Sequence, residues 1–191
     1  YAVKAEAHDK LTQLIMRLLD HVGKGALENP AGGLSHQHFM ARWNAERKTV
    51  HLCAYGWPYK KSTDVYYKGF EWEPVGLTGN DKCGRVCEQG EVSKVSGKYV
   101  HYQAHGVHPS RGARGAGAKA EKHGMPANLL REVLRAADMP PGATVLDLCA
   151  GHCSMKQVAQ EFKLRYVAVD VRDEEVRKGH QLLVYGAMCL V

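Results

Sequence analysis

The sequence contains no apolar run of roughly 18 residues, the length that a membrane-spanning helix requires. Its longest apolar run, residues 182–191, includes Tyr185 and Gly186. The chain opens with no signal-peptide pattern, and no internal repeat is evident along it. These absences argue against a membrane partner and predict an intracellular protein, while the compartment (nuclear, organellar or cytoplasmic) stays open.

The chain has the length of one domain with room for a small insert, because it contains 191 residues of which 45% are hydrophobic. Its net charge of +6 favours an anionic partner such as nucleic acid. Six cysteines in a chain of this size indicate reduced thiols or metal ligands and not a disulfide framework. Since the first residue is Tyr1, we expect a processed product or a part of a longer protein.

Three segments of different character divide the chain. Residues 1–68 and 120–191 carry apolar runs at helical and β-strand spacing, so they are predicted to form two parts of one α/β domain. Residues 69–119 are rich in Gly, Cys, His and Lys and are predicted to form a loop-rich insert. The expected helices are 8–22, 36–43, 125–137 and 154–162, and the expected strands are 26–28, 49–55, 64–67, 144–148, 166–170 and a last run from 182.

The β-α-β unit at residues 144–170, in which the strands 144–148 and 166–170 are expected to be buried, predicts a parallel sheet and a nucleoside-cofactor site. Asp147 lies at the end of the first strand, and a turn of small residues leads into the helix. Asp170 ends the second strand, where an acid can hydrogen-bond ribose hydroxyls. The alternative is an ordinary doubly wound unit with incidental acids.

The run Asp-Leu-Cys-Ala-Gly at residues 147–151 resembles the first motif of S-adenosylmethionine-dependent methyltransferases, especially the DNA cytosine-5 group. The resemblance implies a Rossmann-like methyltransferase sheet. It also implies that Asp147, Cys149, Ala150 and Gly151 form the cofactor turn and that Asp170 binds the ribose.

The segment Glu28-Asn29-Pro30 is similar to the base-binding motif of the same family. The resemblance implies that Glu28 holds N3 and the exocyclic amine of a flipped cytosine, and that Asn29 and Pro30 shape the loop. The alternative is a strand-end turn with a solvated glutamate. Residues 53–64 resemble the next family segment, in which Tyr55 stands where the family commonly has a supporting arginine.

These motifs occur in the reverse of the usual family order, so the chain resembles a circularly permuted methyltransferase. The nucleophile of the family lies in a Pro-Cys dipeptide, and no Pro-Cys occurs here. The missing strand belongs between the cofactor strand and the Glu28 strand, so we expect another stretch, of this protein or of another chain, to fill that position. The alternative is an inactive methyltransferase-like protein that serves as a structural or RNA-binding subunit.

The insert carries two further candidate sites. Cys83, Cys87, His101 and His105 have spacing typical of zinc ligands, which predicts either a zinc-stabilised nucleic-acid-binding module or, alternatively, unlinked thiols and surface imidazoles. The cations Arg111, Arg114 and Lys119 lie in a Gly-rich run that can contact the phosphates of DNA or RNA, or form a solvated loop.

Overall fold

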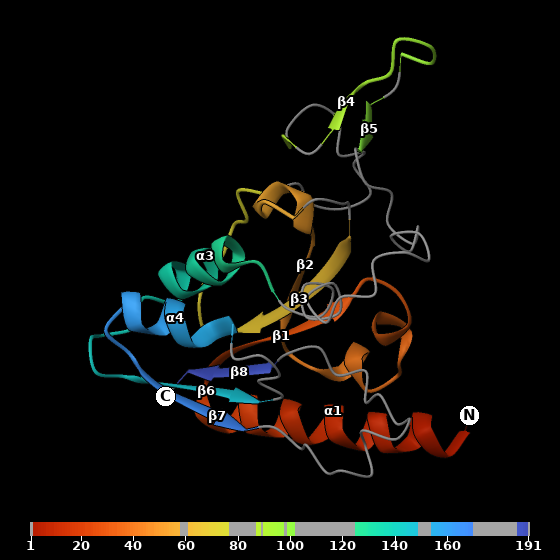
Figure 1. Cartoon of the computed structure of the whole chain (residues 1–191). Coiled ribbons are helices and arrows are strands. Elements are labelled where there is room, and N and C mark those ends of the chain that lie inside the picture. Colours follow the sequence, from red (N-terminus) through yellow and green to blue (C-terminus); the bar gives the residue numbers. More distant parts are fainter. Residues whose placement is uncertain are drawn as a thin grey trace, which may run out of the picture.

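A six-stranded sheet dominates the computed structural model and carries strands from both ends of the chain (Figure 1). The structure describes residues 2–57, 61–76, 87–88, 90–97, 99–101, 125–148, 154–169 and 187–190. The helices are α1 (Ala2–Val22), α3 (Ala127–Ala137) and α4 (Ser154–Glu161), with the 3-10 helices η1 (Gly33–His36), η2 (Met40–Arg42) and η3 (Leu52–Tyr55). The strands of this sheet are β1 (Lys24–Pro30), β2 (Glu46–His51), β3 (Ser62–Lys68), β6 (Thr144–Leu148), β7 (Arg165–Val169) and β8 (Ala187–Leu190).

The strand order is β2-β3-β1-β8-β6-β7. Strands β6 and β7 are parallel, and β8 is antiparallel to both β6 and β1. Strand β1 therefore runs in the same direction as β6 and β7, and the carboxyl ends of all three strands lie at the same edge of the sheet. The general α/β class expected from the sequence agrees with this architecture.

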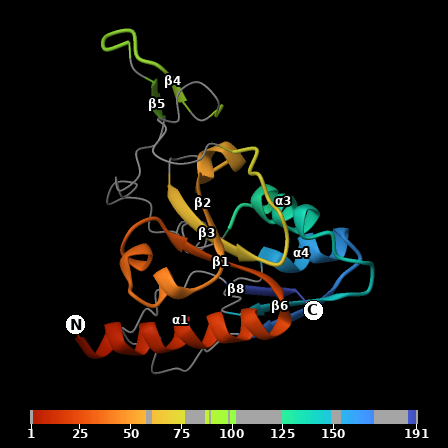
Figure 2. The same cartoon turned by 180° about the vertical axis from the view of Figure 1, so that it is seen from behind.

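Helices cover both faces of the sheet (Figures 1 and 2). Helix α1 packs Ile15, Met16 and Leu19 with Leu27 of β1 and Tyr66 of β3 on one face. Helices α3 and α4 pack on the other face, and their buried residues include Leu129, Leu130, Val133, Leu134, Met155 and Val158. The helical spacing of these apolar residues explains why each helix buries one side against the sheet.

The observed elements differ from the expected ones mainly at their ends. Strand β1 extends through Pro30, which pairs with Thr63, whereas the sequence predicted that the strand stops before the proline. The expected β-run 49–55 divides at His51, after which the chain turns into η3. The expected short helix 36–43 is replaced by η1 and η2.

Strand β7 was expected to be buried, and this prediction is wrong. The strand lies at the end of the sheet order, and Val167 and Val169 are 46% and 43% exposed. An apolar run alone does not distinguish an edge strand from a central one, which is why the sequence misled us here.

The loop-rich insert contributes a small second sheet, in which β4 (Gly90–Val92) pairs with β5 (Tyr99–His101). This hairpin lies apart from the six-stranded sheet in both views (Figures 1 and 2). None of the described helices combines the length and the apolar character that crossing a membrane requires.

Candidate functional site

Glu28 lies on β1 near its carboxyl end and is buried, with 3% of its surface exposed. Its Oε1 atom has no hydrogen-bond partner among the described residues and lies 3.9 Å from Nζ of Lys61. The Thr63 hydroxyl, which also lacks a hydrogen-bond partner in this part of the chain, belongs to the adjoining strand β3. The alternative of a solvated glutamate at a strand end is therefore wrong.

Burial is the main cause that raises the pKa of the Glu28 carboxyl, to about 7. The positive charge of Lys61 is the strongest influence that lowers the pKa of Glu28 against this rise. The nearby Thr63 hydroxyl lowers the pKa less, and it does not have the geometry of a hydrogen bond to Glu28. The buried Asp64 adds a small contribution in the same direction as burial. A carboxyl with this pKa can both hold and release a proton at neutral pH, which an ordinary surface glutamate cannot do.

Asp147, on β6, is the second buried acid on this side of the sheet, with 8% of its surface exposed. The phenol of Tyr166 donates a hydrogen bond of 2.8 Å to its Oδ2 atom. Tyr166 belongs to β7, so the neighbouring parallel strand holds the Asp147 side chain in place.

The register of the sheet relates the two acids to each other. Met188 of β8 pairs with Ala26 on one side and with Asp147 on the other, so Ala26 and Asp147 lie on the same face. Glu28 follows Ala26 by two residues and shares that face. Two strand spacings and two residues of offset separate the Cα atoms of Glu28 and Asp147 by roughly 12 Å. Both acids therefore lie on one face near the carboxyl edge, where α/β sheets usually bind ligands.

Asn29 and Pro30 complete the predicted base-binding segment. Asn29 pairs with Asp64, so it lies on the opposite face from Glu28, and its amide Nδ2 donates a hydrogen bond of 2.9 Å to the carbonyl of Pro30. Pro30 pairs with Thr63 at the end of the ladder. Glu28 and Pro30, two residues apart on β1, thus share the face of Asp147, whereas Asn29 does not.

Lys61 is the cation that pairs with Glu28 among the described residues, and its side chain is 10% exposed. Its Nζ atom also lies 5.7 Å from the centre of the Trp57 ring. The sequence placed Lys61 in a segment that resembles the base-supporting segment of the family, but gave no signal that it pairs with Glu28. That pairing depends on the antiparallel register of β1 and β3, which the sequence does not reveal.

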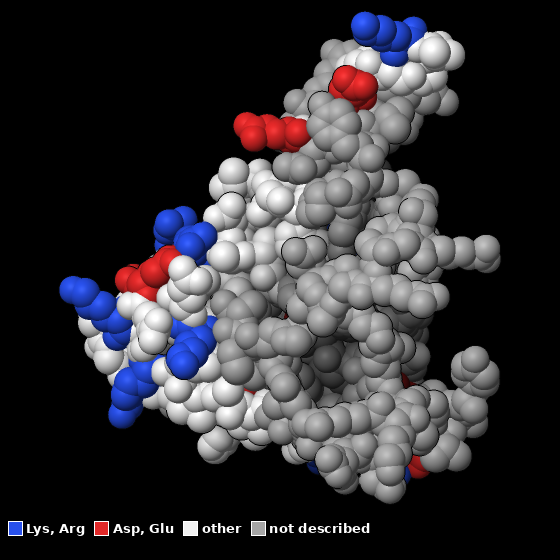
Figure 3. Space-filling model, in the orientation of Figure 1, with Lys and Arg blue, Asp and Glu red and all other residues white. Residues whose placement is uncertain are grey.

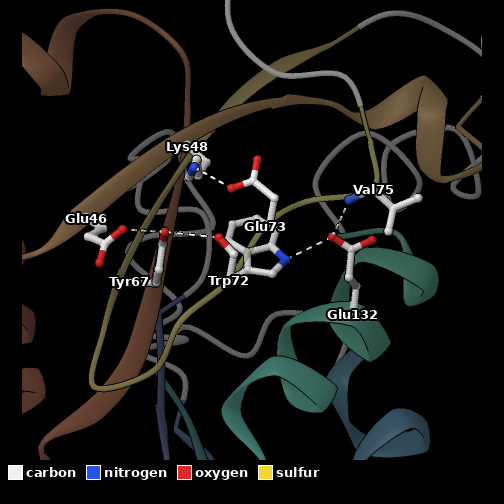
Figure 4. A network of polar contacts seen from close by, with 7 residues as sticks. All are labelled: Glu46, Lys48, Tyr67, Trp72, Glu73, Val75 and Glu132. Carbon is white, nitrogen blue, oxygen red and sulfur yellow. Dashed lines mark hydrogen bonds and ion pairs between the residues drawn. The ribbon is translucent and has the colours of Figure 1, made fainter.

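Tyr55 does not take part in this group of residues. Its hydroxyl donates a hydrogen bond of 3.0 Å to Oε1 of Glu132 on α3 and accepts one of 3.2 Å from the backbone of Gly76. The same Glu132 oxygen accepts hydrogen bonds from the Trp72 indole at 2.8 Å and from the backbone of Val75 at 3.1 Å (Figure 4). The network fixes the segment that follows β3 against α3, so Tyr55 has a structural role.

Several predicted site residues lie outside the described part of the chain. They are the cofactor-turn residues Cys149, Ala150 and Gly151, the ribose acid Asp170, the candidate zinc ligands Cys83 and His105, and the cations Arg111, Arg114 and Lys119. Of the other zinc candidates, Cys87 is buried and His101 pairs with Gly90 in the hairpin. No group of three or more metal-binding side chains occurs among the residues that the structure describes.

The position between the Glu28 strand and the Asp147 strand is occupied by β8 of the same chain. Strand β8 pairs with Lys24–Leu27 of β1 and with Val145–Leu148 of β6. The sequence predicted a strand at this position and left its source open, and the structure supplies it from residues 187–190.

Comparisons with protein-family models, with characterised proteins and with solved structures found no match to this chain.

Proposed function

We propose that this chain is a methyltransferase-like domain in permuted order, which binds S-adenosylmethionine at the turn after β6 and a cytosine-type base at Glu28. One observation carries the proposal. Two buried acids, Glu28 and Asp147, lie on the same face and near the carboxyl ends of two strands that run in the same direction. This is the relative placement that the resemblance implies for the base-binding and cofactor-binding segments.

The chemistry of Glu28 suits a ring that presents an acceptor nitrogen beside an amino group. When protonated, the carboxyl donates a hydrogen bond to the ring nitrogen and accepts one from the amine. Burial that brings the pKa of Glu28 to about 7 makes the protonated form available near neutral pH. The Oε1 atom of Glu28 lacks a hydrogen-bond partner among the described residues, and a bound base would supply one.

Calorimetric titration tests the proposal in two independent arms. S-adenosylmethionine is titrated into the wild-type chain, into Asp170→Asn and into Glu28→Gln. We expect Asp170→Asn to weaken cofactor binding by at least about tenfold, the loss of one good polar contact, and Glu28→Gln to leave it unchanged. The absence of binding at millimolar cofactor contradicts the proposal.

The second arm uses a short single-stranded oligonucleotide with one cytosine, and a control in which uracil replaces that cytosine. We expect the wild-type chain to prefer the cytosine oligonucleotide and Glu28→Gln to lose this preference. An equal affinity of the wild-type chain for both oligonucleotides contradicts the assignment of Glu28 as the base-binding acid.

A second candidate function is an inactive methyltransferase-like subunit of a larger assembly, and β8 favours it. The nucleophile of the family lies at the carboxyl end of a central strand, beside the base. Strand β8 runs opposite to β1 and β6, so its carboxyl end lies at the other edge of the sheet. A folded chain that binds neither cofactor nor oligonucleotide in the two arms above supports this second candidate.

A further inference from the structure

Four exposed cations lie on the side of the molecule formed by α3, α4 and the start of β7. They are Arg135, Lys156, Lys163 and Arg165. Figure 3 shows blue side chains around a smaller red group over the α3 and α4 end of the molecule. We call these four residues the basic corner.

The turn before β6 connects two of these cations, and Phe162 is in contact with a third. Nε of Arg165 donates a hydrogen bond of 3.0 Å to the carbonyl of Gly142, whose own backbone N–H donates one of 2.9 Å to the carbonyl of Lys163. The Arg135 guanidinium lies 6.0 Å from the ring centre of Phe162, the residue before Lys163. Lys156 lies in the first turn of α4, whereas Lys163 follows the carboxyl end of that helix.

Most of this positive charge has no local counter-charge. Glu161 forms a bidentate ion pair with Arg131, with distances of 2.7 and 2.8 Å, and Arg135 makes a smaller contribution to the lowered pKa of the same carboxyl. The side chains of Lys156 and Lys163 make no hydrogen bond or ion pair within the described ranges. Lys156 and Lys163 are thus available to a partner, while Arg135 and Arg165 also make contacts within the fold.

Helix stability explains only part of the arrangement. Cations near the carboxyl ends of α3 and α4 are favourable, which accounts for Arg135 and Lys163. Lys156, however, lies in the first turn of α4, which contains no acid and where a cation is unfavourable. Lys163 also adopts a left-handed backbone with φ 58°, a conformation that glycine adopts at lower cost. Helix stability therefore leaves the positive charge of Lys156 unexplained, and at Lys163 the backbone favours glycine over a lysine.

We propose that the basic corner binds the phosphate backbone of a nucleic acid, at a surface separate from the Glu28 site. Gly142, Lys163 and Arg165 all lie at the amino edge of β6 and β7, since they precede or begin these strands. A strand of five residues is about 16 Å long, so this edge is well separated from the carboxyl edge that holds Glu28. A nucleic acid at the corner is recognised by its charge and not by its bases.

Fluorescence anisotropy with labelled 20-nucleotide RNA and DNA tests the proposal across a range of salt concentrations. The test variant is Arg135→Glu, Lys163→Glu and Arg165→Glu combined. The control variant, Lys10→Glu, Arg17→Glu and Arg42→Glu combined, changes the net charge equally at exposed positions elsewhere on the surface. Circular dichroism checks that both variants are folded.

We expect the test variant to bind at least about tenfold more weakly at low salt. The slope of log Kobs against log salt should also become less steep by roughly 2, because each of three lost contacts to a single strand contributes about 0.7 to that slope. The control variant keeps its affinity within about twofold of the wild type, the change expected when no phosphate contact is lost. Equal weakening by the two variants overturns the proposal, because it shows a response to net charge alone. Binding of the wild-type chain to phosphatidylserine vesicles but not to either oligonucleotide also overturns it.

A single substitution separates binding from folding. In Lys163→Gly the left-handed backbone becomes less strained, so the thermal midpoint should not fall, while one phosphate contact is lost and affinity decreases by a few fold. Unchanged affinity in Lys163→Gly contradicts the proposal. Lys163 precedes β7 at the amino edge of the sheet, away from the proposed cofactor turn and from Glu28, so failure here is distinguishable from failure of the proposed function.

Discussion

Replacing Glu28 with glutamine should change how the stability of the folded chain depends on pH. Glutamine has the shape of the protonated carboxyl and cannot ionise. The Glu28 carboxyl is buried, and its pKa is raised from 4.5 to about 7 in the folded chain. The folded state therefore binds the proton more tightly than the unfolded state does, and wild-type stability decreases as the pH rises from about 4.5 to about 7.

The magnitude follows from the size of this pKa shift. Each pKa unit corresponds to about 1.4 kcal/mol, so ionisation of Glu28 lowers the free energy of unfolding by about 3 kcal/mol once the pH exceeds the folded-state pKa. The glutamine variant avoids this loss. At pH 8 it should be about 3 kcal/mol more stable than the wild type, or roughly 6 to 12 °C higher in thermal midpoint, while at pH 4.5 the two should be similar.

Urea unfolding of both proteins between pH 4.5 and pH 8.5 measures the difference directly, because titration of all other groups cancels. The control is Glu161→Gln, which removes a carboxyl whose pKa is lowered, mainly by its hydrogen bond to Arg131. The stabilising contribution of the Glu161 carboxylate is lost as the pH falls. The difference in stability between Glu161→Gln and the wild type therefore changes with pH in the opposite direction to that of Glu28→Gln. A wild-type chain that becomes more stable than Glu28→Gln as the pH rises refutes the reasoning, since attraction to Lys61 then outweighs burial.

Two other predictions concern the parts of the fold that surround the site. Glu132→Ala removes the acceptor of three hydrogen bonds and should destabilise the chain by about 3 kcal/mol in urea unfolding, with faster proteolysis near residue 75, whereas Glu161→Ala should change little. Gly69→Ala places a Cβ atom 2.0 Å from the carbonyl oxygen of Gly23 at φ 81°, so it should cost more than about 3 kcal/mol. Gly97→Ala, at φ 63° with open space around it, should cost about 1 kcal/mol, and similar thermal midpoints for the two alanine variants contradict this account.

The sequence predicted the elements whose apolar residues recur at a clear spacing. The expected strand 144–148 is β6 itself, and the expected helix 125–137 starts two residues early but ends where α3 ends. Strand ends were less predictable, because pairing partners decide them. Pro30 remains in β1 because its position opposite Thr63 does not require a backbone N–H donor, which proline lacks. No local pattern in the sequence indicates this.

The candidate site was predictable in part. Glu28 and Asp147 were identified from local motifs, but their common face depends on β8 pairing with both β1 and β6. Strand β8 comes from a run near the end of the sequence that has no distinctive motif, so its central position could not be predicted. The pairing of Lys61 with Glu28 was unpredictable for the same reason, because it depends on the register between two strands.

The antiparallel direction of β8 links the fold to the two candidate functions. A strand between β1 and β6 satisfies the backbone groups of both neighbours in either direction, so the sheet is complete without a Pro-Cys strand. The direction matters only for chemistry, because it decides which edge receives the residues at the end of the strand. A Pro-Cys strand from outside these residues must displace β8 from both ladders before its cysteine can reach the Glu28 edge. Under the proposed function, the stability of the sheet with β8 in place would therefore oppose methyl transfer, whereas the proposed base and cofactor binding at that edge does not require the exchange.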